Sequence, residues 1–193
     1  RRRLPLHHGA IRLRQVHVDE RVGLPGPADV WNLSPGWRGC GQSVESQKAF
    51  QPLYAKIKLI YGCNLKCEMC NHWRIPREAP LSIERLLEII DELAELGCRK
   101  IHFSGGEALL RPRVTELVER ASSRGIRVTL TTNGTLLEKE NAKALIRAGL
   151  RGVNISIDSP EKKNHDQIRG VPGSWKKACR AVRLFRQYAH KGK

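Results

Sequence analysis

Three cysteines, Cys63, Cys67 and Cys70, lie within eight residues of one another in this 193-residue chain. Thiolates at this C-x3-C-x2-C spacing, in a loop just after a predicted strand, can converge on one inorganic centre. On a four-iron cluster, three protein ligands leave one iron open to bind something else. The spacing also permits a zinc site completed by His72, or cysteines that bind no metal. The residues alone leave these three interpretations open.

Strand and helix signals alternate around and after the cysteines. N-cap residues, proline in a first turn and terminal glycines mark where the helices begin and end. The repeated β-α order predicts a parallel sheet with right-handed crossovers. Strands are predicted over Lys56–Tyr61, Lys100–Ser104, Ile126–Thr131 and Gly152–Ile157, and helices over 83–97, 112–125, 138–148 and from 174 onward.

The predicted strands are apolar on one face and polar on the other. In the fourth strand, Val153 and Ile155 alternate with Asn154 and Ser156. A sheet covered by helices on both faces would be apolar on both. The alternation favours a curved sheet with helices outside and a polar interior that holds a ligand, so we predict an α/β fold that forms part of a barrel. The residues expected to line that interior are Lys58, His102, Ser104, Thr129, Thr131 and Asn154.

Composition separates residues 1–50 from the rest. They contain most of the turn-forming Pro-Gly pairs, and a short β-hairpin at Ile11–Val18 is the one element predicted there. We therefore predict an N-terminal extension over 1–50 and a core over 51–193.

Half of the net charge of +16 lies in residues 160–193, which hold 10 basic and 2 acidic groups. No nucleic-acid motif accompanies this charge, so we interpret it as a solvated helix and do not expect nucleic-acid binding.

The remaining cysteines are scattered singly. Cys98 and Cys179 are predicted to be small core residues. Cys40, between Gly39 and Gly41, could be an extra cluster or redox ligand, although a lone cysteine rarely is. A secreted disulfide framework would be denser, so clustered cysteines indicate metal and a reducing, cytoplasmic compartment. No stretch approaches the ~18–20 apolar residues of a membrane span, and no membrane association is predicted.

The cysteine spacing and its place after a strand resemble the radical S-adenosylmethionine (SAM) superfamily. Three further segments lie where that family has its motifs: Ser104–Glu107, Thr131–Gly134 and Ser156–Asp158, after the second, third and fourth strands. The segment His165–Gly170 is similar to the loop that follows in cyclic pyranopterin synthases and peptide-modifying maturases. The resemblance covers about residues 53–190.

The resemblance implies a [4Fe–4S] cluster on Cys63, Cys67 and Cys70, and reductive cleavage of SAM. Its products would be methionine and a 5′-deoxyadenosyl radical, which abstracts hydrogen from a small-molecule or peptide substrate. An electron donor such as flavodoxin or ferredoxin is implied as well. The alternative class is a non-catalytic basic binding module with a structural zinc site.

The same resemblance implies contacts to SAM. Glu107 would bind the ammonium group, Met69 would lie beside the adenine, and Ser156 would contact the ribose or the carboxylate. A structural role and a role at the site both stay open for four further residues, Asn133, His165, Asp166 and Arg169. The implied SAM contacts are Met69, Gly105, Gly106, Glu107, Ser156 and Asp158.

The sequence also departs from the family pattern. Ala108 stands where proline is common, and Met69 replaces a commoner aromatic residue. Six β/α units are usual in this fold, whereas four are predicted here, a difference of about 50 residues. We therefore expect a C-terminally incomplete core that lacks the fifth-strand adenosine motif.

Overall fold

A computed structural model describes residues 52–79 and 81–189 of the chain. The predicted extension over 1–50, its hairpin at Ile11–Val18 and Cys40 lie outside these residues. Among the described helices, none combines the length and the apolar character that crossing a membrane requires.

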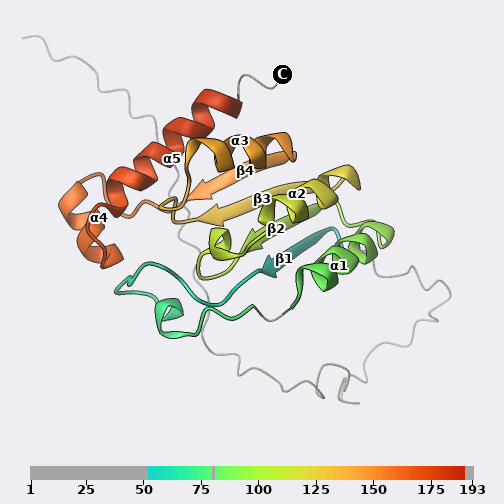
Figure 1. Ribbon diagram of the computed structural model, residues 1–193, viewed down its shortest axis with the longest axis horizontal. Helices are drawn as coiled ribbons and strands as arrows, with labels where there is room; N and C mark the ends of the chain where they lie inside the picture. The colour runs from blue at the N-terminus through green and yellow to red at the C-terminus, as the bar shows by residue number, and fades with distance from the viewer. Residues whose placement is uncertain (1–51, 80, 190–193) are drawn as a thin grey trace, which may run out of the picture. The chain divides into compact units, whose positions relative to one another are not determined.

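Four parallel strands form one sheet in the order β1-β2-β3-β4. They are β1 (Tyr54–Lys58), β2 (Lys100–Ser104), β3 (Arg127–Thr132) and β4 (Leu150–Ile155). All four arrowheads point toward the same edge, where the loop after β1 and helix α4 also lie (Figure 1). The predicted parallel α/β arrangement is confirmed, and it brings the ends of all four strands to one edge.

The helices follow the predicted order, with one addition. They are α1 (Ile83–Glu95), α2 (Val114–Ser123), α3 (Lys139–Arg147), α4 (Lys162–Arg169) and α5 (Ser174–Ala189), with short 3-10 turns η1 (His72–Arg74) and η2 (Ala108–Leu110). Ser82 caps α1, because its hydroxyl accepts a hydrogen bond from the Arg85 N–H at 3.0 Å. Helix α4 was not predicted, because its sequence is polar and only His165 in it is buried.

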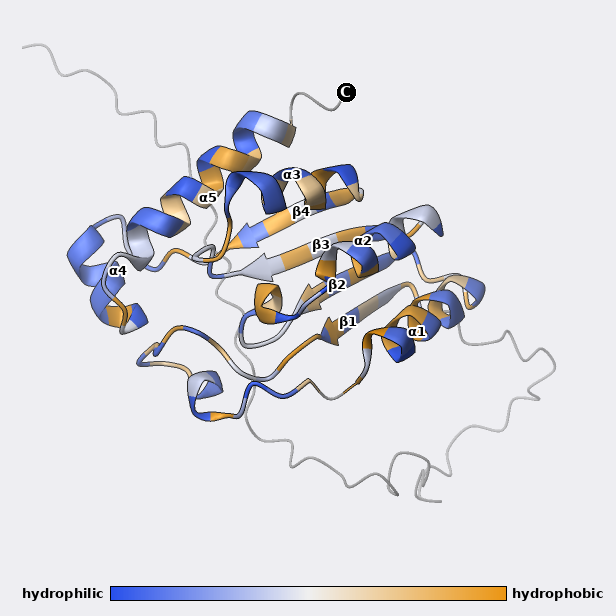
Figure 2. Cartoon of the chain, viewed as in Figure 1, coloured by the Kyte–Doolittle hydropathy of each residue, from blue (hydrophilic) through white to orange (hydrophobic). Residues whose placement is uncertain are grey.

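The core lies between the apolar face of the sheet and the helices. Phe103 of β2 and Leu130 of β3 are fully buried there, together with Ile90 of α1 and Leu117 of α2. Figure 2 shows hydrophobic residues on the strands and along one side of α1. Burial of these side chains is the main force that holds the helices on the sheet.

Some predicted boundaries differ from the observed ones. Strands β1 and β4 each begin and end earlier than predicted, since the chain leaves the sheet after Lys58 and Ile155 to build the loops described below. Helix α2 begins at Val114, beyond Pro112, because Arg113 before it has a left-handed φ of 61°. The predicted polar face is present, and on it His102 lies opposite Thr129 in the register of β2 and β3.

Candidate functional site

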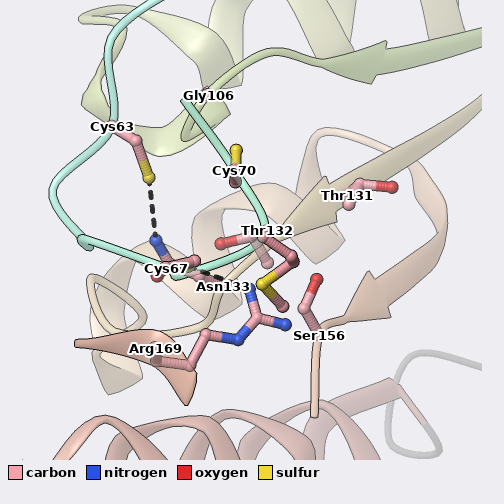
Figure 3. A pocket seen from close by; sticks show the side chains of 10 residues that line it. Cys63, Cys67, Cys70, Gly106, Thr131, Thr132, Asn133, Ser156 and Arg169 are labelled. Carbon is pink, nitrogen blue, oxygen red and sulfur yellow. Dashed lines mark hydrogen bonds between the residues drawn. The ribbon is translucent and has the colours of Figure 1, made fainter. Parts of the chain in front are cut away.

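The three clustered cysteines line one cavity of about 100 Å³ at the carboxyl edge of the sheet (Figure 3). Of the other predicted site residues, Met69, Gly106 and Ser156 also line it. Met69 is 61% exposed. The rest of the lining comes from Thr131, Thr132, Asn133 and Arg169.

The Gly-Gly turn after β2 packs against the segment that leads into the cysteine loop. Gly106 N–H donates to the Ile60 carbonyl at 3.0 Å, and Glu107 N–H donates to the Gly62 carbonyl at 3.1 Å. A Cβ on Gly106 would lie 2.2 Å from the Gly62 oxygen, and Gly105 has a φ of +147°. Both glycines are therefore required by the close approach of two backbones.

Glu107 lies behind the cavity wall and is 1% exposed. One carboxylate oxygen, Oε1, accepts from the Leu109 N–H at 3.0 Å and the Thr132 hydroxyl at 2.7 Å. The other, Oε2, accepts from the Asn133 N–H at 2.7 Å. Burial raises the pKa of Glu107, and these hydrogen bonds oppose that shift. A carboxylate has about four acceptor positions, so about one position, on Oε2, is left for a further donor.

Asn133 connects the end of β3 to the cysteine loop. Its Nδ2 atom donates to Asn64 Oδ1 at 2.8 Å and to Cys63 Sγ at 3.8 Å, the second drawn as a dashed line in Figure 3. Asn64 Nδ2 in turn donates to Thr135 Oγ1 at 2.8 Å. Burial raises the pKa of the Cys63 thiol, and hydrogen bonds from Leu65 N–H and Asn133 oppose it. Asn133 thus links the end of β3 to the cysteine loop, and sequence analysis missed its partners Asn64 and Thr135.

The C-terminal end of α4 supports the cysteine loop from the other side. The Lys66 N–H donates to the Arg169 carbonyl at 3.1 Å, and the Glu68 N–H donates to the Ile168 carbonyl at 3.0 Å. Gly170 follows with a φ of +65°, and a Cβ there would lie 2.3 Å from the Lys66 oxygen. The loop is thus held by backbone contacts that only glycine at this position permits.

The Arg169 side chain forms a charged link between α4, β4 and Cys67. Its Nε atom lies 2.5 Å from Asp158 Oδ2, and its terminal nitrogens donate to Asp158 Oδ1 at 3.0 Å and to Cys67 Sγ at 3.7 Å. Burial raises the pKa of the Cys67 thiol, and the guanidinium opposes that shift. Asp158, one of the implied SAM contacts, has Arg169 as its side-chain partner and does not line the cavity.

His165 and Asp166 complete a structural network around α4. The Asp158 N–H donates to His165 Nδ1 at 3.2 Å, and His165 is 1% exposed. Burial lowers the pKa of His165, as does the charge of Arg169, which keeps the imidazole neutral. Asp166 accepts from Gly173 N–H and Trp175 N–H, both at 2.8 Å, at the start of α5. For these two residues the structure favours the structural role over direct catalysis.

The donor set fits a cluster better than a single ion. Across residues 52–79 and 81–189, no three His, Cys, Asp or Glu side chains lie close enough to hold one metal ion. The zinc alternative needs His72, whose Nδ1 lies 2.8 Å from the Tyr61 carbonyl oxygen and which does not line the cavity. Three thiols around a cavity, two of them receiving N–H donors, suit a larger anionic iron–sulfur group.

Comparison with known protein families gives a match over most of the chain. The family described as the Radical SAM superfamily matches residues 57–192. The AdoMet-dependent heme synthase of Oleidesulfovibrio alaskensis is 36% identical over 129 residues, which are 65% of this chain and 33% of that protein. The PqqA peptide cyclase of Granulibacter bethesdensis is 33% identical over 138 residues, 70% of this chain and 37% of that protein.

A solved structure of native anSMEcpe with bound AdoMet is similar as well. It has a TM-score of 0.59 and 29% identity, and covers 71% of this chain and 41% of that one. The chain thus spans 33%, 37% and 41% of the lengths of these three proteins. The predicted partial (β/α)6 barrel is confirmed by this likeness, with four of its β/α units described here.

Proposed function

The chain belongs to the radical SAM superfamily, and from this membership we propose that it cleaves SAM reductively with a [4Fe–4S] cluster held by Cys63, Cys67 and Cys70. Members of the superfamily use such a cluster together with SAM. When bound, the cluster supplies one electron that breaks the sulfur–carbon bond of SAM, which yields methionine and a 5′-deoxyadenosyl radical. The observation that carries the proposal is the cavity lined jointly by the three cysteines, Gly106 and Ser156.

The residues around the cavity have distinct proposed roles. Backbone at Gly106 and the remaining acceptor position of Glu107 would bind the methionine ammonium group, and Ser156 would bind the ribose or carboxylate. Met69, exposed at the rim, would cover the adenine. Gly105 and Asp158 would act indirectly, by setting the turn after β2 and by holding Arg169.

For the substrate, we propose a chemical class and not a particular compound. The similar proteins include a heme synthase and a peptide cyclase, and one similar structure contains AdoMet and a peptide. These likenesses support a biosynthetic or peptide-modifying hydrogen abstraction, with flavodoxin or ferredoxin as the electron donor.

The test is anaerobic reconstitution with iron and sulfide, reduction with dithionite and addition of SAM. We expect 5′-deoxyadenosine and methionine in equal amounts, measured by chromatography. A protein that holds a full complement of iron yet forms no 5′-deoxyadenosine would overturn the proposal, as would stoichiometric zinc in place of iron.

Replacing Arg169 by glutamine is expected to lower the midpoint potential of the cluster by about 50 mV. Reduction adds a negative charge next to Cys67, and loss of the nearby guanidinium makes that charge less favourable; 59 mV corresponds to a ten-fold change for one electron. Electron paramagnetic resonance at a series of set potentials measures the shift. Arg169→Lys should restore part of it.

Arg120→Gln is the matched control, because Arg120 pairs with Asp91 on the outer helices at 2.7 Å. It removes the same charge far from the cysteines and should leave the potential unchanged. Equal midpoint potentials in the Arg169→Gln and wild-type proteins would show that Arg169 does not affect the cluster and only pairs with Asp158.

A further inference from the structure

Four basic side chains lie on the polar face of the sheet, outside the cavity. They are Lys56 and Lys58 of β1, Lys100 of β2 and Arg127 of β3, which we call the cationic face. In the strand register, Lys100 lies opposite Arg127. Lys56 and Lys58 of β1 lie opposite His102 and Ser104 of β2. Residues two apart along a strand are about 7 Å apart, so the four charges occupy a small area.

These charges have no acidic partners on the described part of the sheet. None of the four takes part in an ion pair of the described residues, and the strands contribute no Asp or Glu to this face. Some arginines on the outer helices are paired by contrast, as Arg85 of α1 is with Glu92 and Arg120 of α2 is with Asp91, each at 2.7 Å. Neighbouring like charges are unfavourable and create a positive potential that attracts anions.

His102 lies in the middle of this face, and its pKa depends on the positive potential there. Its Nδ1 and Nε2 atoms lie 2.8 Å and 2.9 Å from the hydroxyls of Thr129 and Thr131. Burial lowers the pKa of His102, and the charges of Lys56 and Lys100 lower it further. The neutral imidazole therefore adds no charge to this face, and its pKa depends on the neighbouring lysine charges.

A buried hydroxyl without a partner lies beside these charges. Ser104 is 8% exposed, lies opposite Lys58 in the register of β1 and β2, and has an Oγ atom that makes no hydrogen bond within the described residues. An unpaired buried hydroxyl is unfavourable unless a ligand or water satisfies it. Thr131, on the same face, also lines the cavity, so this surface continues from the candidate SAM site.

We propose that the substrate carries at least two anionic groups, phosphate or carboxylate, that bind the cationic face and Ser104 while its reacting carbon lies at the cavity. Lysine ammonium groups suit such oxyanions as point charges with several donors. Along the strands, Lys58 and Ser104 lie level with Thr131 of the cavity wall, whereas Lys100 and Arg127 lie about 14 Å from it. This inference rests on the proposed SAM chemistry, because that chemistry is what brings a substrate to this edge of the sheet.

The test measures binding of two probes, inorganic tripolyphosphate and citrate, to the reconstituted protein by calorimetry at fixed ionic strength. Lys56→Ala combined with Lys58→Ala should weaken binding at least about ten-fold. Lys176→Ala combined with Lys177→Ala removes the same charge from exposed positions of α5 and should change it less than about two-fold. Binding of either probe with this pattern supports the proposal, and the tighter one identifies phosphate or carboxylate as the preferred group.

Nuclear magnetic resonance of His102 gives a second readout. Saturating tripolyphosphate should raise the pKa of His102, and so should Lys56→Ala without any anion, because each removes positive potential. Equal losses of probe affinity in the two double variants, or no loss of affinity in either, would overturn the proposal. Since SAM cleavage without substrate needs none of these lysines, 5′-deoxyadenosine formation separates failure of this inference from failure of the proposed function.

Discussion

Replacing any one of Cys63, Cys67 or Cys70 by alanine is expected to abolish iron binding after anaerobic reconstitution. All three thiols line the same cavity, and a cluster held by two thiolates is labile because its binding energy depends on the complete ligand set. We expect bound iron to fall at least about ten-fold, measured by iron and sulfide analysis and by the visible absorption of the cluster. Circular dichroism would show that the fold persists.

Cys98→Ala is the matched control for these variants. Cys98 is 5% exposed after α1, and its thiol donates to the Lys100 carbonyl at 3.4 Å, away from the cavity. The substitution should lower stability modestly and leave iron content at the wild-type value. Wild-type iron in any of the three cavity variants would contradict the assignment of the cluster.

Replacing Glu107 by glutamine is expected to impair both folding stability and SAM binding. Three donors point at the carboxylate, from Leu109, Thr132 and Asn133, and glutamine would turn an N–H group toward at least one of them. Such a mismatch in a buried site costs about 1–3 kcal/mol in the free energy of unfolding. Loss of the charge facing the SAM ammonium group should weaken binding roughly ten- to a hundred-fold.

Two measurements separate these effects. Chemical denaturation gives the stability change, and a SAM titration of the reconstituted protein gives the affinity. Glu119→Gln, at an exposed position of α2, is the control and should change neither. Reduced stability with wild-type SAM affinity would assign Glu107 only the structural role, whereas unchanged stability would contradict the hydrogen bonds described here.

The sequence alone determined the features that depend on local spacing. The cysteine triad, the Gly-Gly-Glu turn and the order of strands and helices are readable because turns, caps and alternation are properties of neighbouring residues. The polar and apolar faces of the strands followed for the same reason, since successive side chains on a strand point to opposite sides. These features were sufficient to predict the family and the fold class.

Only the tertiary structure decided which distant residues meet the cysteines. Asn133 is 70 positions from Cys63 and Arg169 is 102 positions from Cys67, yet each donates to its sulfur. Their proximity depends on strand register and on the docking of α4, a helix whose polar sequence predicts no element. The cationic face has the same origin, because pairing of three parallel strands, and not the sequence around any one residue, places Lys100 opposite Arg127 and Lys56 opposite His102.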